Sequence, residues 1–141
     1  AAHVSSGAAK GHQAQNGGLV WNSVTAGFAL AKKTNKPIVV DFYTDWCGWC
    51  KVMDEQTFNN DAVKKVLASK FVLVRANAED GADGQKLSKA LEVRGFPTTV
   101  LCDPGGTPKA VMVGFVRPDK FSAQLSEFLT AKPAVAPAAS E

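Results

Sequence analysis

Two cysteines, Cys47 and Cys50, lie two residues apart between an apolar run over residues 38–43 and a helix-compatible stretch over 52–58. The first turn of a helix presents unpaired backbone N–H groups and the positive end of the helix dipole. Both features stabilise a thiolate, which becomes a nucleophile near neutral pH. A second thiol one turn later can attack the mixed disulfide that the first thiol forms. The spacing therefore predicts a dithiol/disulfide redox site.

The composition argues against several other classes of protein. The chain has 141 residues, 45% of them hydrophobic, which is enough for one domain with its own core. Its three cysteines are too few for a disulfide scaffold. The net charge is only +3 and no basic run exceeds two residues, so we expect no nucleic-acid partner. No apolar stretch approaches the roughly 20 residues that span a bilayer.

The two ends of the chain differ in composition from its middle. Residues 1–18 are rich in Ala, Gly, Ser, Gln and Asn and predict a flexible arm, while residues 132–141 predict a flexible Ala/Pro tail. We expect His3 and His12 in the arm to be solvated, and no metal site, because two distant histidines are a poor ligand set. Residues 19–131 are therefore the predicted folded domain.

The first residues bear on the compartment. The chain begins Ala-Ala-His without an initiator methionine, as a product of signal peptidase or of trimming would. We expect a periplasmic or otherwise exported protein, with the cytoplasm as the alternative.

The apolar pattern within 19–131 predicts alternating helices and strands. A strand–helix–strand half with a right-handed crossover precedes a hairpin–helix half, whose turn is marked by the sequence Asp-Pro-Gly-Gly at 103–106. The expected fold is α/β, with a central four-stranded mixed sheet, helices on both faces and an extra N-terminal helix. The predicted elements are a helix over 19–36, strand 38–43, helix 52–58, a helix from 59 or 60 to 68, strand 71–77, helix 87–91, strands 98–102 and 110–115, and helix 118–130.

Two aspartates accompany the cysteine pair. Asp41 interrupts the apolar strand before the cysteines, where a carboxylate is costly to bury unless it is paired or can take up a proton. We interpret Asp41 as a buried proton acceptor beneath the cysteines, with an exposed position at a strand edge as the alternative. Asp54 lies four residues beyond Cys50, on the same helical face.

Three further residues have simpler interpretations. Trp21 is expected in the core rather than stacked on a ligand. Cys102 lies on a predicted core strand and is expected to be a buried, inert thiol. Lys51 either influences the potential of the cysteine pair or is an ordinary solvated lysine.

Three stretches resemble the thioredoxin superfamily. VVDFYTDWCGWCK (39–51) resembles its active-site strand and motif, GFPTT (95–99) its cis-proline loop, and VMVGF (111–115) its closing hairpin. The similarity covers Leu19 to Thr130 and is greatest to the carboxy-terminal thioredoxin-like domain of the disulfide-interchange protein DsbD and to small exported thioredoxin-related proteins. The chain departs from thioredoxin at Gly48-Trp49, where thioredoxin has Gly-Pro. Residues at these positions tune the thiolate, so the redox potential is not carried over.

The resemblance implies a role for each residue of the motif. Cys47 resembles the exposed attacking thiolate, and Cys50 the buried resolving thiol. Asp41 matches the buried aspartate that handles the proton of Cys50. Asp54 lies where DsbD-type domains carry a second acid.

The same resemblance implies a docking surface. Pro97 matches the cis-proline that presents an extended backbone edge to a partner peptide, and Phe96 before it faces the substrate. We expect Trp46 to pack beneath the active-site loop, and Trp49 to lie exposed as an anchor for the partner.

The expected activity is that of a thiol:disulfide oxidoreductase that reduces disulfides of partner proteins, with no cofactor beyond a redox-active Cys47–Cys50 disulfide. Its partners would be disulfide-bearing proteins and a membrane thiol-reductant donor such as a DsbD-like shuttle, and we expect a monomer. One alternative is an oxidase or isomerase on the same fold. Another is a metal-holding or chaperone module that uses the two thiols.

Overall fold

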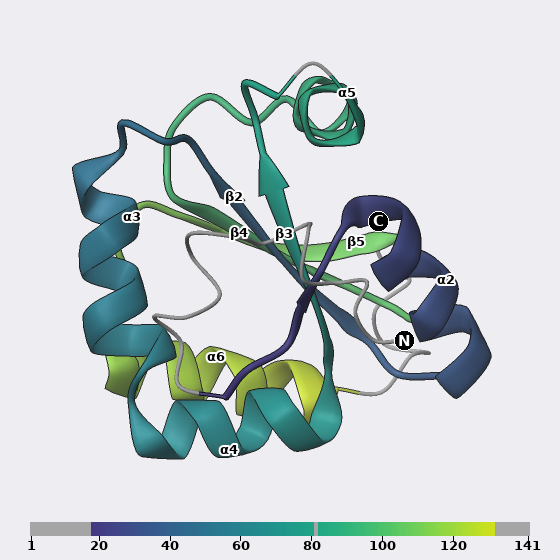
Figure 1. Cartoon of the computed structure of the whole chain (residues 1–141). Coiled ribbons are helices and arrows are strands. Elements are labelled where there is room, and N and C mark those ends of the chain that lie inside the picture. The colour runs from purple at the N-terminus through teal and green to yellow at the C-terminus, as the bar shows by residue number, and fades with distance from the viewer. Residues whose placement is uncertain (1–17, 81, 132–141) are drawn as a thin grey trace.

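The computed structural model describes residues 18–80 and 82–131, which form a sheet with helices on both faces (Figure 1). The two ends that we predicted to be flexible lie outside these residues, except for Gly18. The elements are β1 (Trp21–Asn22), α2 (Val24–Thr34), β2 (Ile38–Tyr43), α3 (Gly48–Met53), the π-helical turn η2 (Asp54–Phe58), α4 (Asp61–Lys70), β3 (Val72–Asn77), α5 (Asp83–Ala90), β4 (Thr98–Cys102), β5 (Pro108–Val113) and α6 (Pro118–Thr130).

The sheet has the strand order β1-β3-β2-β4-β5. Strands β1 and β2 both pair with β3 in parallel, while β4 pairs antiparallel with β2 and with β5. The parallel β2–β3 pair is joined by a crossover through α3, η2 and α4, and β4–β5 is a hairpin. This arrangement confirms the predicted mixed α/β fold and places β2 in the centre of the sheet.

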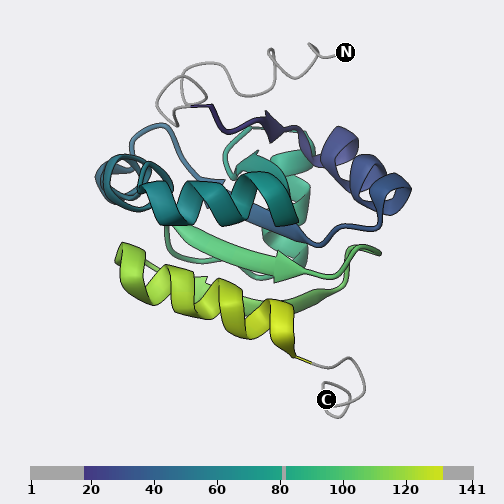
Figure 2. The ribbon, with the colours of Figure 1, turned by 90° about the horizontal axis from the view of Figure 1, so that it is seen from below.

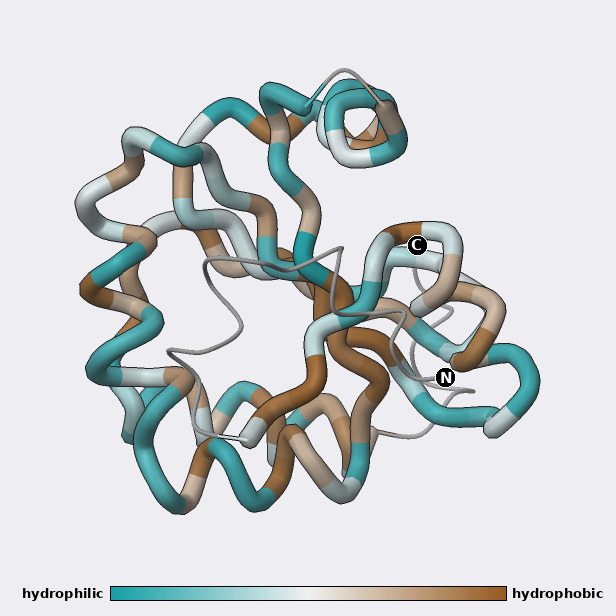
Figure 3. Tube along the Cα trace, viewed as in Figure 1, coloured by the Kyte–Doolittle hydropathy of each residue, from teal (hydrophilic) through white to brown (hydrophobic). Residues whose placement is uncertain are grey.

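Two apolar clusters lie on opposite faces of the sheet. The first joins the sheet to α3, η2, α4 and α6, and includes Val39, Met53, Leu67 and Phe121. The second joins it to α2 and α5. Figure 2 shows α4 and α6 side by side, and Figure 3 shows the hydrophobic residues concentrated in the central strands. Strand β2 is buried along its whole length because helices cover both of its faces.

The N-terminal part of the domain differs from the prediction. Trp21 and Asn22 form a fifth strand, paired with Leu73 and Val74 of β3, where we predicted a helix from residue 19. The helix begins only at Val24, because Ser23 is extended and caps it by accepting a hydrogen bond from the Ala26 N–H at 3.2 Å. The sheet therefore has five strands rather than the predicted four.

Other helix and strand boundaries differ from the predicted ones by a few residues. The helix after the cysteines begins at Gly48 rather than at residue 52, and its last five residues form the π-helical turn η2. Helix α5 begins at Asp83, and β5 spans Pro108–Val113 rather than residues 110–115. Trp21 is fully buried, as predicted. No helix within the described residues is both long and apolar enough to cross a membrane.

Candidate active site

The two cysteines of the motif form a disulfide at the start of α3. Cys47 is the N-cap residue of this helix, and its sulfur accepts a hydrogen bond from the backbone N–H of Cys50 at 3.1 Å. The sulfur therefore lies where helix N–H groups stabilise negative charge. The exposed fractions are 5% for Cys47 and 4% for Cys50, so both cysteines are buried in this oxidised form and the predicted difference in exposure is only slight. The disulfide packs against Tyr43 and Phe96.

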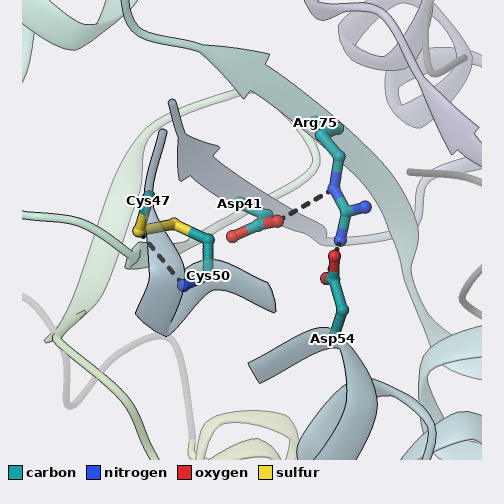
Figure 4. A network of polar contacts seen from close by, with 5 residues as sticks. All are labelled: Asp41, Cys47, Cys50, Asp54 and Arg75. Atoms are coloured by element: carbon teal, nitrogen blue, oxygen red, sulfur yellow. Dashed lines mark hydrogen bonds and ion pairs between the residues drawn. A yellow bond between two sulfur atoms is a disulfide. The ribbon is translucent and has the colours of Figure 1, made fainter. Parts of the chain in front are cut away.

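A buried group of charges lies behind the disulfide (Figure 4). Asp41 is only 3% exposed, so the alternative of an exposed strand edge is wrong. Its Oδ2 atom forms an ion pair with Nε of Arg75 at 2.9 Å, and Nη2 of the same guanidinium binds Oδ1 of Asp54 at 2.8 Å. Figure 4 shows the Asp41 carboxylate between the disulfide and Arg75, with its second oxygen on the side of Cys50. The structure thus brings together both predicted acids and the cysteine pair.

Arg75 is the residue that the sequence reasoning missed. It lies directly opposite Asp41 in the parallel register of β2 and β3. Its guanidinium lies 4.0 Å from the centre of the Trp21 ring, and the rings of Tyr43 and Phe58 lie within 6 Å (5.8 and 5.7 Å). One signal was present: β3, like β2, has a single charged residue within an apolar run.

Asp54 lies where α3 passes into the π-helical turn η2. Asp54 is 2% exposed, and Thr57 and Phe58 of the same turn are also buried. The Thr57 hydroxyl donates a hydrogen bond to the Val116 carbonyl at 2.5 Å. Asp54 is the first residue of this turn and lies inside the domain beside Arg75. Such π-helical turns frequently occur at functional sites.

The loop before β4 completes the site. The Phe96–Pro97 peptide bond is cis, as the resemblance implied. Pro97 is buried, and its carbonyl accepts a hydrogen bond from the Gly114 N–H at 2.7 Å. Phe96 is half-buried and packs against the disulfide group, and its role as a substrate-facing residue stays a prediction.

Two tryptophans flank the disulfide. Trp46 is 67% exposed, so the prediction that it packs beneath the loop is wrong. Its indole N–H donates to the Glu79 carboxylate at 2.9 Å, and its ring meets Phe96 edge to face at 6.4 Å. These contacts hold it on the surface. Trp49 is exposed as predicted, at 61%, and its ring lies 5.7 Å from that of Phe115.

The remaining predicted residues have simple surroundings. Gly48 and Lys51 are exposed on α3. Cys102 is a free cysteine buried in the apolar cluster of the α2/α5 face. Burial, with a smaller contribution from Asp103, raises the pKa of its thiol to about 12. Burial also raises the pKa of the Tyr43 hydroxyl beside the charged group. Within residues 18–80 and 82–131, no group of three His, Cys, Asp or Glu residues could hold a metal ion.

The fold and this site define the class of protein. A model of the thioredoxin-like domain family matches residues 25–129, and the chain belongs to that family. The chain is 38% identical over 100 residues to the thiol:disulfide interchange protein DsbD of Ralstonia nicotianae, covering 70% of this chain and 16% of that protein. The resemblance stated from the sequence is therefore confirmed, although the chain spans only a small part of the length of this relative.

Solved structures confirm the fold. A thioredoxin from Thermus thermophilus gives a TM-score of 0.74 at 22% identity, covering 82% of this chain and 90% of that chain. The oxidoreductase DsbH gives a TM-score of 0.69 at 24% identity, covering 81% of this chain and 86% of that chain.

Proposed function

We propose that this protein is a reductase of protein disulfides in the bacterial cell envelope. The observation that carries the proposal is the Asp41 carboxylate, buried between Cys50 and Arg75. A dithiol that resolves a mixed disulfide must deprotonate its second thiol, and a carboxylate at this point is placed to take that proton. The similarity to DsbD, a thiol:disulfide interchange protein, supports the same proposal and the periplasmic location.

The proposed reaction has two exchange steps. The Cys47 thiolate, stabilised by the N-terminus of α3, attacks one sulfur of the partner disulfide and releases the other as a thiolate, which takes a proton from water. Cys50 then gives its proton to Asp41 and attacks Cys47. The Cys47–Cys50 disulfide forms, the second partner thiolate leaves, and two electrons have passed to the partner. A membrane thiol donor would return the protein to the dithiol.

The exposed aromatic residues support a protein as the substrate. Trp46 with Phe96, and Trp49 with Phe115, form two aromatic pairs beside the disulfide. Exposed aromatic side chains are effective anchors in protein interfaces. We infer that a partner chain lies across the Phe96–Pro97 loop, where its disulfide meets Cys47.

Trapping tests the mechanism. Replacing Cys50 with Ala should let Cys47 form mixed disulfides that no second thiol resolves, visible on non-reducing gels of periplasmic extracts. The matched control, Cys47→Ala, should trap none. The absence of trapped species from both variants, with any disulfide substrate, would overturn the mechanism.

The equilibrium potential tests the direction of transfer. A value near that of thioredoxin, about −270 mV, supports reduction, whereas one near that of DsbA, about −120 mV, would make the protein an oxidant. A glutathione buffer series with quantified dithiol and disulfide forms gives this value.

A further inference from the structure

The end of the domain opposite the disulfide carries a group of lysines in two segments without acidic residues. Residues 19–40 and 62–78 contain no Asp or Glu. Helix α2 has Lys33 in its last turn and Lys36 shortly after it, and α4 ends with Lys70. Figure 1 shows the C-terminal ends of α2 and α4 on the side of the domain away from α3. The lysines therefore gather far from the cysteine pair.

These lysines border an apolar groove. The groove has a volume of about 200 Å³, lies beside β1 and the two helix ends, and is lined by Val20, Leu30 and Lys36 among others. Val20 is 57% and Leu30 39% exposed. The N–H of Val72 donates to the Pro37 carbonyl at 2.9 Å, which holds the segment after α2 against the segment after α4. Lysine and exposed apolar side chains therefore share one surface.

We propose that this end of the domain binds the surface of an anionic phospholipid bilayer. Lysine ammonium groups attract anionic headgroups, and Val20 and Leu30 enter the boundary between headgroups and acyl chains. Positive charge beside exposed apolar side chains is complementary to such a surface. Phe71 lines the groove but is only 4% exposed, so it offers no ring on which nucleic-acid bases could stack.

Lysines at the C-terminus of a helix also interact favourably with the negative end of its dipole. That role accounts for Lys33 and Lys70, which lie in the last turns of α2 and α4. It does not account for Val20 and Leu30, which leave apolar surface exposed beside them. Binding to lipid uses both features at once.

The charges at the other end of the domain favour one orientation on the bilayer. Asp45 lies two residues before Cys47, and Glu79 and Asp80 follow the end of β3 on the same side. Strand β2 separates the two ends with six residues, about 20 Å at roughly 3.3 Å per residue. An anionic surface attracts the lysines and repels these acids, so the disulfide is held towards the aqueous phase, where a protein partner can reach it.

Vesicle binding tests the role of the lysines. The full chain should sediment with vesicles of equal parts phosphatidylglycerol and phosphatidylcholine but not with vesicles of phosphatidylcholine alone, and added salt should weaken the binding. Each lysine near an anionic surface contributes about fivefold to the affinity. The triple variant Lys33→Gln, Lys36→Gln and Lys70→Gln should therefore bind roughly 100-fold more weakly.

A matched control removes three exposed cations from α5 and the loop after it. The variant Lys86→Gln, Lys89→Gln and Arg94→Gln has the same net charge as the first triple variant. Figure 1 shows α5 away from the C-terminal ends of α2 and α4. Its affinity should therefore fall by less than about fivefold, the contribution of a single lysine.

A second variant tests the apolar part of the surface. Val20→Ser combined with Leu30→Ser should weaken binding to the mixed vesicles by about tenfold, because two exposed apolar side chains no longer enter the lipid boundary. A single-stranded DNA oligonucleotide at the same salt concentration should bind far more weakly than the vesicles, because it offers charge without an apolar layer.

Several results would overturn the proposal. These are equal binding to vesicles with and without phosphatidylglycerol, no binding to either, equal losses from the two triple variants, and an unchanged affinity in Val20→Ser with Leu30→Ser. Binding of the oligonucleotide as tight as that of the mixed vesicles would also overturn it, since the lysines would then be a site for any polyanion. Vesicle binding uses neither cysteine, so its outcome is independent of the reductase proposal.

Discussion

Cys50 and Cys102 are buried to nearly the same extent, 4% and 1%, but lie in opposite chemical environments. Cys50 lies in the first turn of α3, beside Asp41 and its ion pair with Arg75. Cys102 lies at the other end of the sheet, opposite Ile38 at the start of β2, among apolar side chains. Burial raises the pKa of the Cys102 thiol to about 12 and leaves it protonated at neutral pH.

The comparison shows that burial does not decide the reactivity of a cysteine in this fold. An apolar environment penalises the thiolate, whereas helix N–H groups can stabilise it. The Cys47 sulfur already accepts such a hydrogen bond in the oxidised form. The paired strands β2 and β4 thus have two different ends. At the disulfide end, buried charges and helix N–H groups surround the cysteines, whereas at the other end Cys102 lies among apolar side chains. Four predictions test this difference.

The largest effect concerns the cysteines themselves. Cys47→Ala should reduce the rate of insulin-disulfide reduction to the uncatalysed background, because it removes the N-cap thiol of α3 that makes the first attack in the proposed exchange. Cys102→Val should retain the native rate. Catalysis by the Cys47→Ala protein through Cys102 would show that the apolar end is reactive after all.

The second effect concerns stability at the charged end. Arg75→Met should destabilise the oxidised protein by about 3–5 kcal/mol at neutral pH, because two buried carboxylates lose their cation. The loss should shrink in acid, as the carboxylates take up protons. Urea unfolding at several pH values measures both. The control at the apolar end, Cys102→Val, nearly conserves volume and should cost less than about 1.5 kcal/mol. Equal losses from the two variants would contradict the prediction.

The third effect appears at the apolar end in alkali. The thiol of Cys102 has a pKa of about 12 in the folded protein against 9.0 for a solvated thiol, so between these pH values the unfolded chain binds fewer protons. Its contribution to stability is complete below pH 9 and is lost as the pH rises, at roughly 1.4 kcal/mol per pH unit. Cys102→Val should remove this part of the decrease in the free energy of unfolding with pH. An identical slope in both proteins would show that Cys102 is not the source.

The sequence predicted those parts of the site that depend on local pattern. Cys47, Cys50 and Asp41 lie within ten residues of one another, so their arrangement follows from a single strand and the start of a single helix. Arg75 could not be placed in this way. Its contact with Asp41 depends on the register between two strands more than 30 residues apart, and a charged residue within a strand is usually an exposed one.

The remaining differences also come from contacts distant in sequence. Strand β1 has only two residues and exists because Trp21 and Asn22 find partners on β3, about 50 residues later, which overrides the helical spacing of 19–36. Trp46 is held on the surface by Glu79, a partner 33 residues away. Local propensity predicted the helices and central strands well because those elements bury regular apolar faces.

The smallest effect concerns exposed apolar side chains. Trp49→Ala should raise the KM for a protein disulfide by up to about tenfold and leave kcat nearly unchanged, because an anchor residue contributes to docking and does not take part in the exchange. Val20 is a matched control: it is 57% exposed, against 61% for Trp49, but precedes β1 at the Cys102 end of the sheet. Val20→Ala should leave both constants unchanged. A rise in KM for Trp49→Ala with no change for Val20→Ala would support Trp49 as part of the docking surface, and equal values would remove it from that surface.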